Sequence, residues 1–205
     1  MTADRSRQRS TLALTVLALL AEEPMHAYRM HELIRQRGKD TVVNVAQRNS
    51  VYQTIARLLR IGWIRVQATQ QDPGRPERVV YEITPEGRAT ATQWLKDMLG
   101  KPAREFPEFP AALAYLPLLT PAEARRQLAA RAEHLRAVLA QSQAATRGAL
   151  AQGLPRLFLV EDEYRQAMMK AEIAWVAGLV RALQDGELTW SAQWLRRIAA
   201  QFGAT

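Results

Sequence analysis

One stretch of the sequence, residues 50–84, constrains the fold more than any other. Its first part is amphipathic, and its apolar residues recur at the spacing of one buried helix face: Val51, Ile55, Leu58 and Leu59. Its second part holds two segments of alternating apolar and polar residues, 64–69 and 79–84, joined by a run rich in glycine and proline. This pattern predicts a helix followed directly by a β-hairpin with a long tip.

Two further helices are predicted before this stretch and one after it. The first covers residues 12–21, and the second runs from about His26 to Arg37. The second is expected to bury four residues: Tyr28, Met30, Leu33 and Ile34. After the hairpin, Thr84 is expected to cap a helix that begins at Pro85. Three helices, two strands and a helix follow the order of a winged helix-turn-helix domain.

The rest of the chain is predicted to be helical. Residues 100–110 contain three prolines and no helical period, so we place a linker there, between a winged domain at residues 1–99 and a helical domain at residues 111–205. Thr120 to Glu123 form a capping-box pattern that starts a long helix, and a second long helix is expected over about residues 157–183. The predicted fold class is therefore mainly α, with a small β-hairpin wing.

The composition excludes several classes of function. The chain of 205 residues carries a formal net charge of +8, which favours polyanionic partners, and it has no cysteine for disulfides or thiol chemistry. The pair His31-Glu32 lacks the second histidine of a zincin helix, and no glycine-rich phosphate loop follows a strand. We expect no enzyme activity, no metal and no cofactor. The apolar run at residues 12–21 is too short to cross a bilayer, so we expect a cytoplasmic protein without a membrane segment.

The third helix and the hairpin are the predicted DNA-binding elements. If the apolar face of this helix packs inward, Ser50, Gln53, Thr54 and Arg57 fall on the opposite face, where they can reach base edges in a major groove. Arg48 and Asn49 stand at the helix start, which favours a phosphate, and Tyr52 either reaches the DNA backbone or packs into the core. Arg75 and Arg78 give the hairpin positive charge for the DNA backbone.

At this point the residues resemble the PadR family of bacterial transcriptional regulators. Residues 17–28 resemble the family's "LxLLxxxPxHGY" segment, residues 44–64 resemble its "NxxRGSxYxxLxxLxxxGLI" recognition segment, and residues 75–88 resemble its wing and the "YxLTxxGR" motif. Residues 109–135 and 172–190 are similar to the C-terminal helical domain of the longer members. Ala27 and Asn49 depart from the family pattern, which has glycine at both places. Asn49 still tolerates the left-handed conformation that such a turn requires.

The resemblance implies a homodimeric regulator, commonly a repressor, that reads a pseudo-palindromic operator in double-stranded DNA and is released by a small molecule or a stress signal. Aromatic and methionine side chains are the candidate lining of an effector pocket, although such residues at helical spacing more often form a core: Trp94, Tyr115, Tyr164, Met168 and Trp175. The alternative is a winged-helix adaptor that binds proteins rather than an operator. The operator, the regulated genes, the effector and the sign of regulation are not encoded in any motif.

Overall fold

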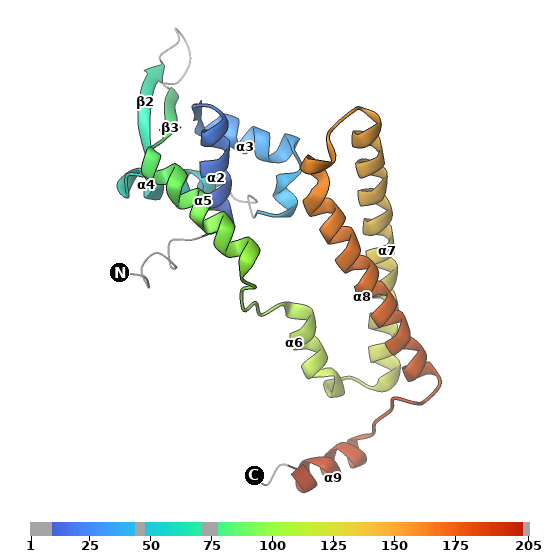
Figure 1. Cartoon of the computed structure of the whole chain (residues 1–205). Helices are drawn as coiled ribbons and strands as arrows, with labels where there is room; N and C mark the ends of the chain where they lie inside the picture. The colour runs from blue at the N-terminus through green and yellow to red at the C-terminus, as the bar shows by residue number, and fades with distance from the viewer. Residues whose placement is uncertain (1–9, 44–47, 71–77, 203–205) are drawn as a thin grey trace. The chain divides into compact units, whose positions relative to one another are not determined.

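The computed structural model describes residues 10–43, 48–70 and 78–202 and divides into two compact units, Met1–Arg104 and Glu105–Thr205 (Figure 1). The predicted fold class is confirmed, since the structure is mainly helical with one small antiparallel sheet. None of the helices described is both long and apolar enough to cross a membrane.

The first unit contains four α-helices, one short 3-10 helix and three strands among the residues described (Figure 1). Their order and bounds are α2 Thr11–Glu22, β1 Met25–His26, α3 Ala27–Gln36, η1 Lys39–Thr41, α4 Arg48–Arg60, β2 Ile64–Gln70, β3 Arg78–Ile83 and α5 Pro85–Gly100. The three predicted helices, the two strands and the final helix are thus all present, with bounds that shift by a few residues.

Side-chain caps define where the helices of this unit begin. The Ser10 hydroxyl accepts a hydrogen bond from the Ala13 amide (3.1 Å) at the start of α2, and the Thr84 hydroxyl accepts one from Gly87 (3.1 Å) at the start of α5. At the start of α3 the cap is a histidine: the His26 Nδ1 accepts from the Arg29 amide at 3.0 Å. Each cap satisfies a backbone N–H that has no partner within its own helix.

The sheet has the order β1-β3-β2 and is antiparallel throughout. β1 is a strand that the sequence pattern did not predict, because two residues are too few to show an alternation. It pairs Met25 with Tyr81 and His26 with Val80, and α3 begins at Ala27, one residue after the predicted start near His26. A bulge between Val66 and Ala68 shifts the β2–β3 register, and Val80 is buried.

The core of the first unit is formed by α2, α3, α4, α5 and the start of β2. Its largest fully buried side chains include Leu17, Met30, Ile34 and Leu58. Trp94 of α5 is only 5% exposed and packs edge-on against Trp63, with the ring centroids 5.2 Å apart. The expectation that Tyr28 is buried is wrong, because Tyr28 is 63% exposed in the first turn of α3, outside the arc that packs on α4.

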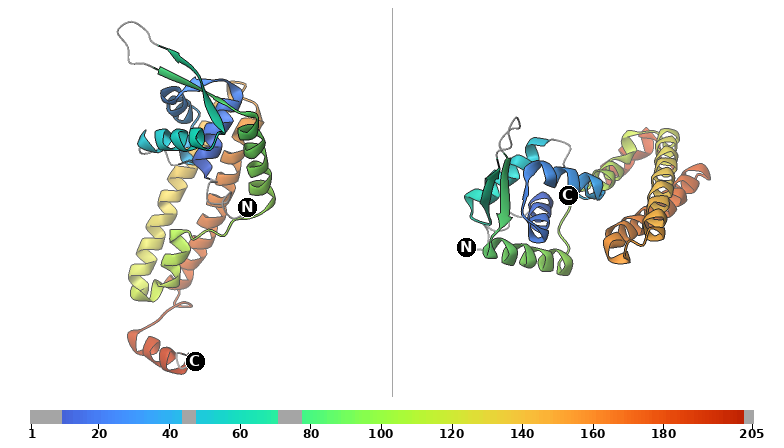
Figure 2. Two further views of the ribbon diagram at one scale, coloured as in Figure 1. Left: turned by 90° about the vertical axis from the view of Figure 1, so that its left-hand side faces the viewer. Right: turned by 90° about the horizontal axis from the view of Figure 1, so that it is seen from above.

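The second unit is built around two long helices that lie side by side in all the views (Figures 1 and 2). Its elements are α6 Glu108–Ala114, η2 Leu116–Leu118, α7 Pro121–Ala151, η3 Arg156–Leu159, α8 Val160–Gln184 and α9 Ala192–Phe202. The capping box at Thr120 and Glu123 is formed as predicted. The predicted linker is longer than the non-helical segment: α5 extends through Gly100 and α6 begins at Glu108, because a proline in the first turn of a helix interrupts no hydrogen bond.

Polar contacts join α7 to α8. The buried Gln166 amide donates to the Ser142 hydroxyl (3.0 Å) and to the Thr146 hydroxyl (2.9 Å). Further along, Arg131 pairs with Glu172 (Nε to Oε1, 2.6 Å), and the Arg131 guanidinium lies 3.7 Å from the centre of the Phe109 ring. The amide and the ion pair therefore set how the two long helices are aligned.

Candidate nucleic-acid interface

Helix α4 presents one face to the core and another to solvent. Val51, Ile55 and Leu58 are buried, as expected from their spacing. The exposed positions follow a stride of four residues through Tyr52, Ala56 and Arg60, with Gln53 beside them. A helix with one packed face and one free polar face meets the requirement for insertion into a major groove.

The exposed face of α4 is not quite the one predicted. Thr54 is only 8% exposed, and its hydroxyl donates to the Ser50 carbonyl oxygen at 2.8 Å, so we correct its placement on the groove-facing side. The reason is tertiary: both α2 and α3 pack on α4, and together they cover a wider arc than the four apolar residues mark. Gln53 remains exposed, and Ser50 is half-buried at the edge of the face.

Arg57 is half-buried and has a partner within the unit. Its Nη2 donates to the Ser10 hydroxyl at 3.3 Å, and this hydroxyl also caps α2. Arg57 therefore ties α4 to α2 and lies at the border of the exposed face. Arg60, which sequence reasoning missed, is the exposed arginine at the end of α4. The four-residue stride from Tyr52 was the signal that could have found it.

A pocket lies where α3, α4 and the strand β3 meet. It is lined by His26, Ala27, Tyr28, Tyr52, Arg78, Val79 and Tyr81. Arg78 and the two tyrosines from the helices are exposed, whereas burial raises the pKa of the Tyr81 phenol, with Tyr52 adding to the effect. A guanidinium and hydroxyl donors around one hollow suit a phosphate group. Tyr28 is a second residue that sequence reasoning missed here, because it had been assigned to the core.

For three of the predicted site residues the structure describes no side-chain position. Arg48 and Asn49 are the first two residues of α4, at the end where a helix favours an anion. Arg75 lies in the hairpin tip, outside the residues that the structure describes. Arg78, the first residue of β3, is the described arginine of the wing that the prediction had named.

The residues expected to line an effector pocket belong to two different units. Trp94 belongs to the core of the first unit, whereas Tyr115, Tyr164, Met168 and Trp175 lie in the second unit and are between 49% and 69% exposed. Trp175 packs edge-on against Phe109, with centroids 6.3 Å apart. The effector pocket therefore stays a prediction, and within the second unit three of its members lie on an exposed stripe of α8.

The fold and the exposed face of α4 define the first unit as a winged helix-turn-helix domain. Residues 16–93 match the model of the transcriptional regulator PadR-like family, so the chain carries a PadR-like domain, as the sequence motifs had indicated. This family consists of transcriptional regulators rather than enzymes. No curated protein matches the chain by sequence.

Solved structures with the same fold cover most of the chain. PadR of Bacillus subtilis, in a complex with operator DNA, is 17% identical with a TM-score of 0.70, and the match covers 85% of this chain and 99% of that one. The virulence activator AphA of Vibrio cholerae is 20% identical with a TM-score of 0.65, at 85% and 99% coverage. PadR of Bacillus subtilis has also been solved with p-coumaric acid, at 14% identity, a TM-score of 0.65, and 86% and 98% coverage.

Proposed function

We propose that this chain is a sequence-specific DNA-binding regulator that acts as a homodimeric repressor and is released by a small molecule or a stress signal. The observation that carries the proposal is the free polar face of α4, which lies beside a basic β-hairpin within a PadR-like domain. An adaptor that binds proteins has no need of this combination.

The residues divide into base-reading and backbone-binding groups. Gln53 is the candidate for adenine and Arg60 for guanine, since an amide and a guanidinium each make paired hydrogen bonds to these bases. Tyr28, Tyr52 and Arg78 are the candidates for phosphate contacts, which set the position of the protein on the duplex. Arg57 is a weaker candidate for base contact, because its guanidinium already bonds Ser10.

The test of DNA binding is fluorescence anisotropy on duplexes tiled across the region upstream of the protein's own gene, with random DNA as competitor. We expect one tile to resist competition, and Gln53→Ala to weaken that specific binding by about 1–3 kcal/mol while sparing nonspecific binding. Gln127→Ala, at an exposed glutamine of α7, is the matched control and should change neither. Equal, weak binding of all tiles would favour the adaptor instead.

The homodimer is proposed from an exposed apolar stripe along α8. Val160, Tyr164, Met168, Ala171 and Trp175 recur every three or four residues and are all exposed, whereas Gln166, Val176 and Leu183 occupy the opposite, buried face. A two-fold axis brings the same stripe of a second copy against the first. A dimer of this kind would place two recognition helices about 34 Å apart, one turn of DNA, for a pseudo-palindromic operator.

The dimer is tested by placing a charge in the stripe. Met168→Glu is expected to turn the dimer into a monomer in sedimentation velocity, because pairing would bury the new carboxylate. Lys170→Glu introduces the same acid at an exposed position outside the stripe and should leave the dimer intact. A Met168→Glu protein that stays dimeric would place the interface elsewhere.

Release by an effector and the sign of regulation rest on the structural relatives. One of them is described with p-coumaric acid and another as an activator, so both properties need direct measurement in this chain. The first probe is p-coumaric acid itself, titrated into the protein–DNA complex. Loss of anisotropy would support release by a small aromatic acid, and transcription from a template that carries the bound tile distinguishes repression from activation.

A further inference from the structure

An open pocket of about 650 Å³ lies within the second unit, where the start of α6 faces α7 and α8; we call it the α6 pocket. Its apolar lining comes from α6 and the residue before it: Pro107, Phe109, Pro110 and Ala112. Three charged residues complete the lining, namely Glu108, Arg131 and Glu172. The volume and the mixture of an apolar wall with a few charged groups are typical of sites for small organic molecules.

The aromatic part of this wall is held in place by two neighbours. The Arg131 guanidinium of α7 lies 3.7 Å from the centre of the Phe109 ring. Trp175 of α8 packs edge-on against the same ring, with the centroids 6.3 Å apart. Phe109 also packs against the buried core of the second unit. The wall is therefore formed in the free protein, and a ligand loses little affinity to ordering it.

One of the three charged groups in the α6 pocket has no counter-ion. Arg131 and Glu172 pair with each other (Nε to Oε1, 2.6 Å), so their charges offset. Glu108 is exposed in the first turn of α6 and makes no hydrogen bond or ion pair with any residue that the structure describes. The helix dipole favours an acid at this position but supplies no counter-ion. Two carboxylates and one guanidinium thus give the lining a net charge of −1.

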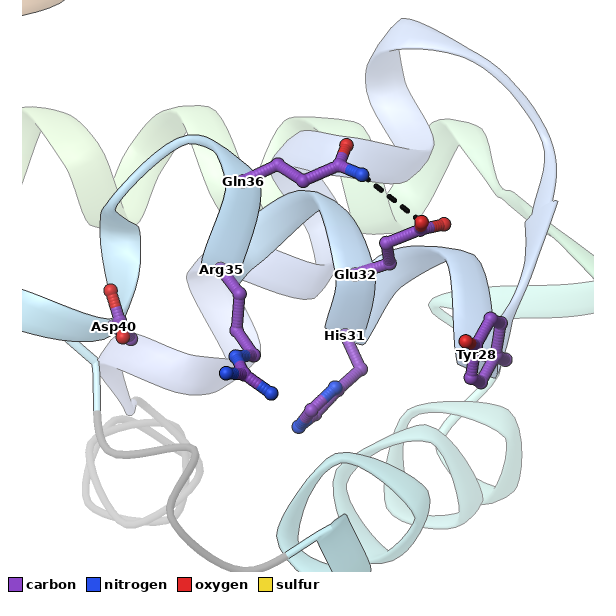
Figure 3. Close-up of a pocket in the computed structure, with 6 residues that line it drawn as sticks. All are labelled: Tyr28, His31, Glu32, Arg35, Gln36 and Asp40. Atoms are coloured by element: carbon purple, nitrogen blue, oxygen red, sulfur yellow. Dashed lines mark hydrogen bonds between the residues drawn. The ribbon is translucent and has the colours of Figure 1, made fainter.

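A pocket on α3 in the first unit shows the contrast. It is lined by Tyr28, His31, Glu32, Arg35, Gln36 and Asp40 (Figure 3). Glu32 accepts hydrogen bonds from Arg29 (3.1 Å) and from Gln36 (3.0 Å), so its charge is paired. Arg35 and Asp40 bring one charge of each sign. The pocket on α3 therefore favours neither cations nor anions, and it lacks the apolar wall of the α6 pocket.

From these contacts we propose that the α6 pocket binds a small organic cation, with an apolar or aromatic body and an amine, amidinium or quaternary ammonium group. The body lies against Phe109 and the two prolines, and the cationic group pairs with Glu108. An organic anion would meet the like charge of Glu108, and Arg131 offers it little compensation because Glu172 already offsets that charge. The site lies within the second unit, so the proposal does not depend on DNA binding.

The experiment compares three probes that have nearly the same shape but different charges: benzamidine is a cation, benzamide is neutral and benzoate is an anion. Each is titrated into the full-length protein without DNA, and binding is followed by NMR of the tryptophan indoles. The Trp175 signal, identified by its loss in Trp175→Phe, should shift because this indole packs against Phe109. Since Glu108 is exposed, we expect benzamidine to bind about two- to fivefold more tightly than benzamide, and benzoate to bind most weakly. High salt should reduce these differences.

Two pairs of variants locate the site. Glu108→Gln should make benzamidine and benzamide bind alike, whereas Glu105→Gln, at an exposed acid outside the lining, should keep the preference for the cation. Ala112→Phe fills the α6 pocket and should remove most of the binding of benzamidine. Ala111→Phe makes the same change at an exposed residue of α6 outside the lining and should leave binding intact. Circular dichroism confirms that each variant is folded.

The proposal is overturned if the wild type binds none of the probes, binds all three equally or prefers benzoate. A preference for benzamidine that survives Glu108→Gln, or full binding by Ala112→Phe, overturns it as well, because the cation would then bind elsewhere. The assay contains no DNA, so each of these results leaves the proposed DNA-binding function standing. Conversely, a failure to find an operator would not affect the α6 pocket.

Discussion

The two units of this chain have almost the same length but bury their apolar residues very differently. In the first unit every α-helix contributes to one closed core, from Val16 in α2 to Trp94 in α5. In the second unit the buried residues are confined to segments of α7 and α8 and to Leu159 of η3, and many large apolar side chains stay exposed. A closed core allows a domain to fold alone, whereas an exposed apolar stripe indicates a surface that another chain covers. The difference supports the proposal that the first unit recognises DNA and the second unit joins two copies of the chain.

The largest effect is expected from opening the closed core. Leu58→Ala removes a fully buried side chain of α4 and should lower the free energy of unfolding by about 2–5 kcal/mol, through lost burial and the cavity left behind. Leu157→Ala, at a side chain that is 76% exposed in η3, should cost no more than about 0.5 kcal/mol. Urea unfolding followed by circular dichroism measures both. A large loss of unfolding free energy from Leu157→Ala would show that Leu157 is covered in the assembled protein. The two units would then differ less in how they bury their apolar residues.

Alanine substitutions at two glycines should change the free energy of unfolding in opposite directions. A Cβ on Gly87 would clash with the Trp63 carbonyl oxygen, so Gly87→Ala should push the start of α5 away from Trp63 and cost about 1–3 kcal/mol or more. A Cβ on Gly148, in the last turn of α7, would meet nothing within 4 Å, and Gly148→Ala should stabilise the protein by up to about 1 kcal/mol. Thermal unfolding distinguishes them. If Gly148→Ala destabilises as well, then this part of α7 is covered in the assembled protein.

The helix caps extend the comparison to pH. His26→Ala and Thr120→Ala each remove a cap and should each cost about 1 kcal/mol, whereas His26→Asn should cost less, because asparagine also caps. Hydrogen bonds from Thr120 hold the pKa of Glu123 below its ordinary value, so this cap is retained above about pH 4.5 and lost only as the pH falls further. Hydrogen exchange of the Arg29 and Glu123 amides reports each cap. Loss of protection at the Glu123 amide already well above pH 4.5 would contradict the assignment.

The smallest effect is expected at the surface. Arg37 and Glu22 form two hydrogen bonds of 2.7 Å, and this contact lowers the pKa of Glu22. Arg37→Gln should cost about 0.2–1 kcal/mol, less at high salt, because the pair is solvent-exposed. Arg156→Gln breaks the comparable pair with Glu163 in the second unit. The salt dependence of unfolding of the two variants should be alike, and a much larger loss from either would identify a pair that assembly buries.

The sequence was most informative where structure is local. The spacing of Val51, Ile55 and Leu58 predicted α4, and the caps at Thr84 and Thr120 predicted two helix starts, since each depends on residues within a few positions. Features set by packing were missed. Tyr28 is exposed and Thr54 is buried because α2 and α3 share the surface of α4, and no periodicity within one helix records such an arrangement.

The same limit explains why the exposed stripe of α8 was not predicted. Tyr164, Met168 and Trp175 are aromatic or long apolar residues on one face of a helix, and a sequence pattern does not distinguish the wall of a pocket from an outer surface. The structure places them outward because Gln166 and Val176 occupy the side that packs on α7. The pocket lined by His31, Arg35 and Asp40 was also not predictable from the sequence, because Asp40 belongs to η1 and lies beside α3 only in the folded chain.

The amide of Gln166 determines which surface of α8 the second unit presents to a partner chain. If α8 slid by one turn along α7, this amide would move away from Ser142 and Thr146 and lose both hydrogen bonds. A leucine at this position would tolerate several alignments and could even stabilise the pair. Gln166 thus fixes the alignment of α8 on α7, at some cost in stability. A partner that binds the outer side of α8 therefore always meets the same set of side chains.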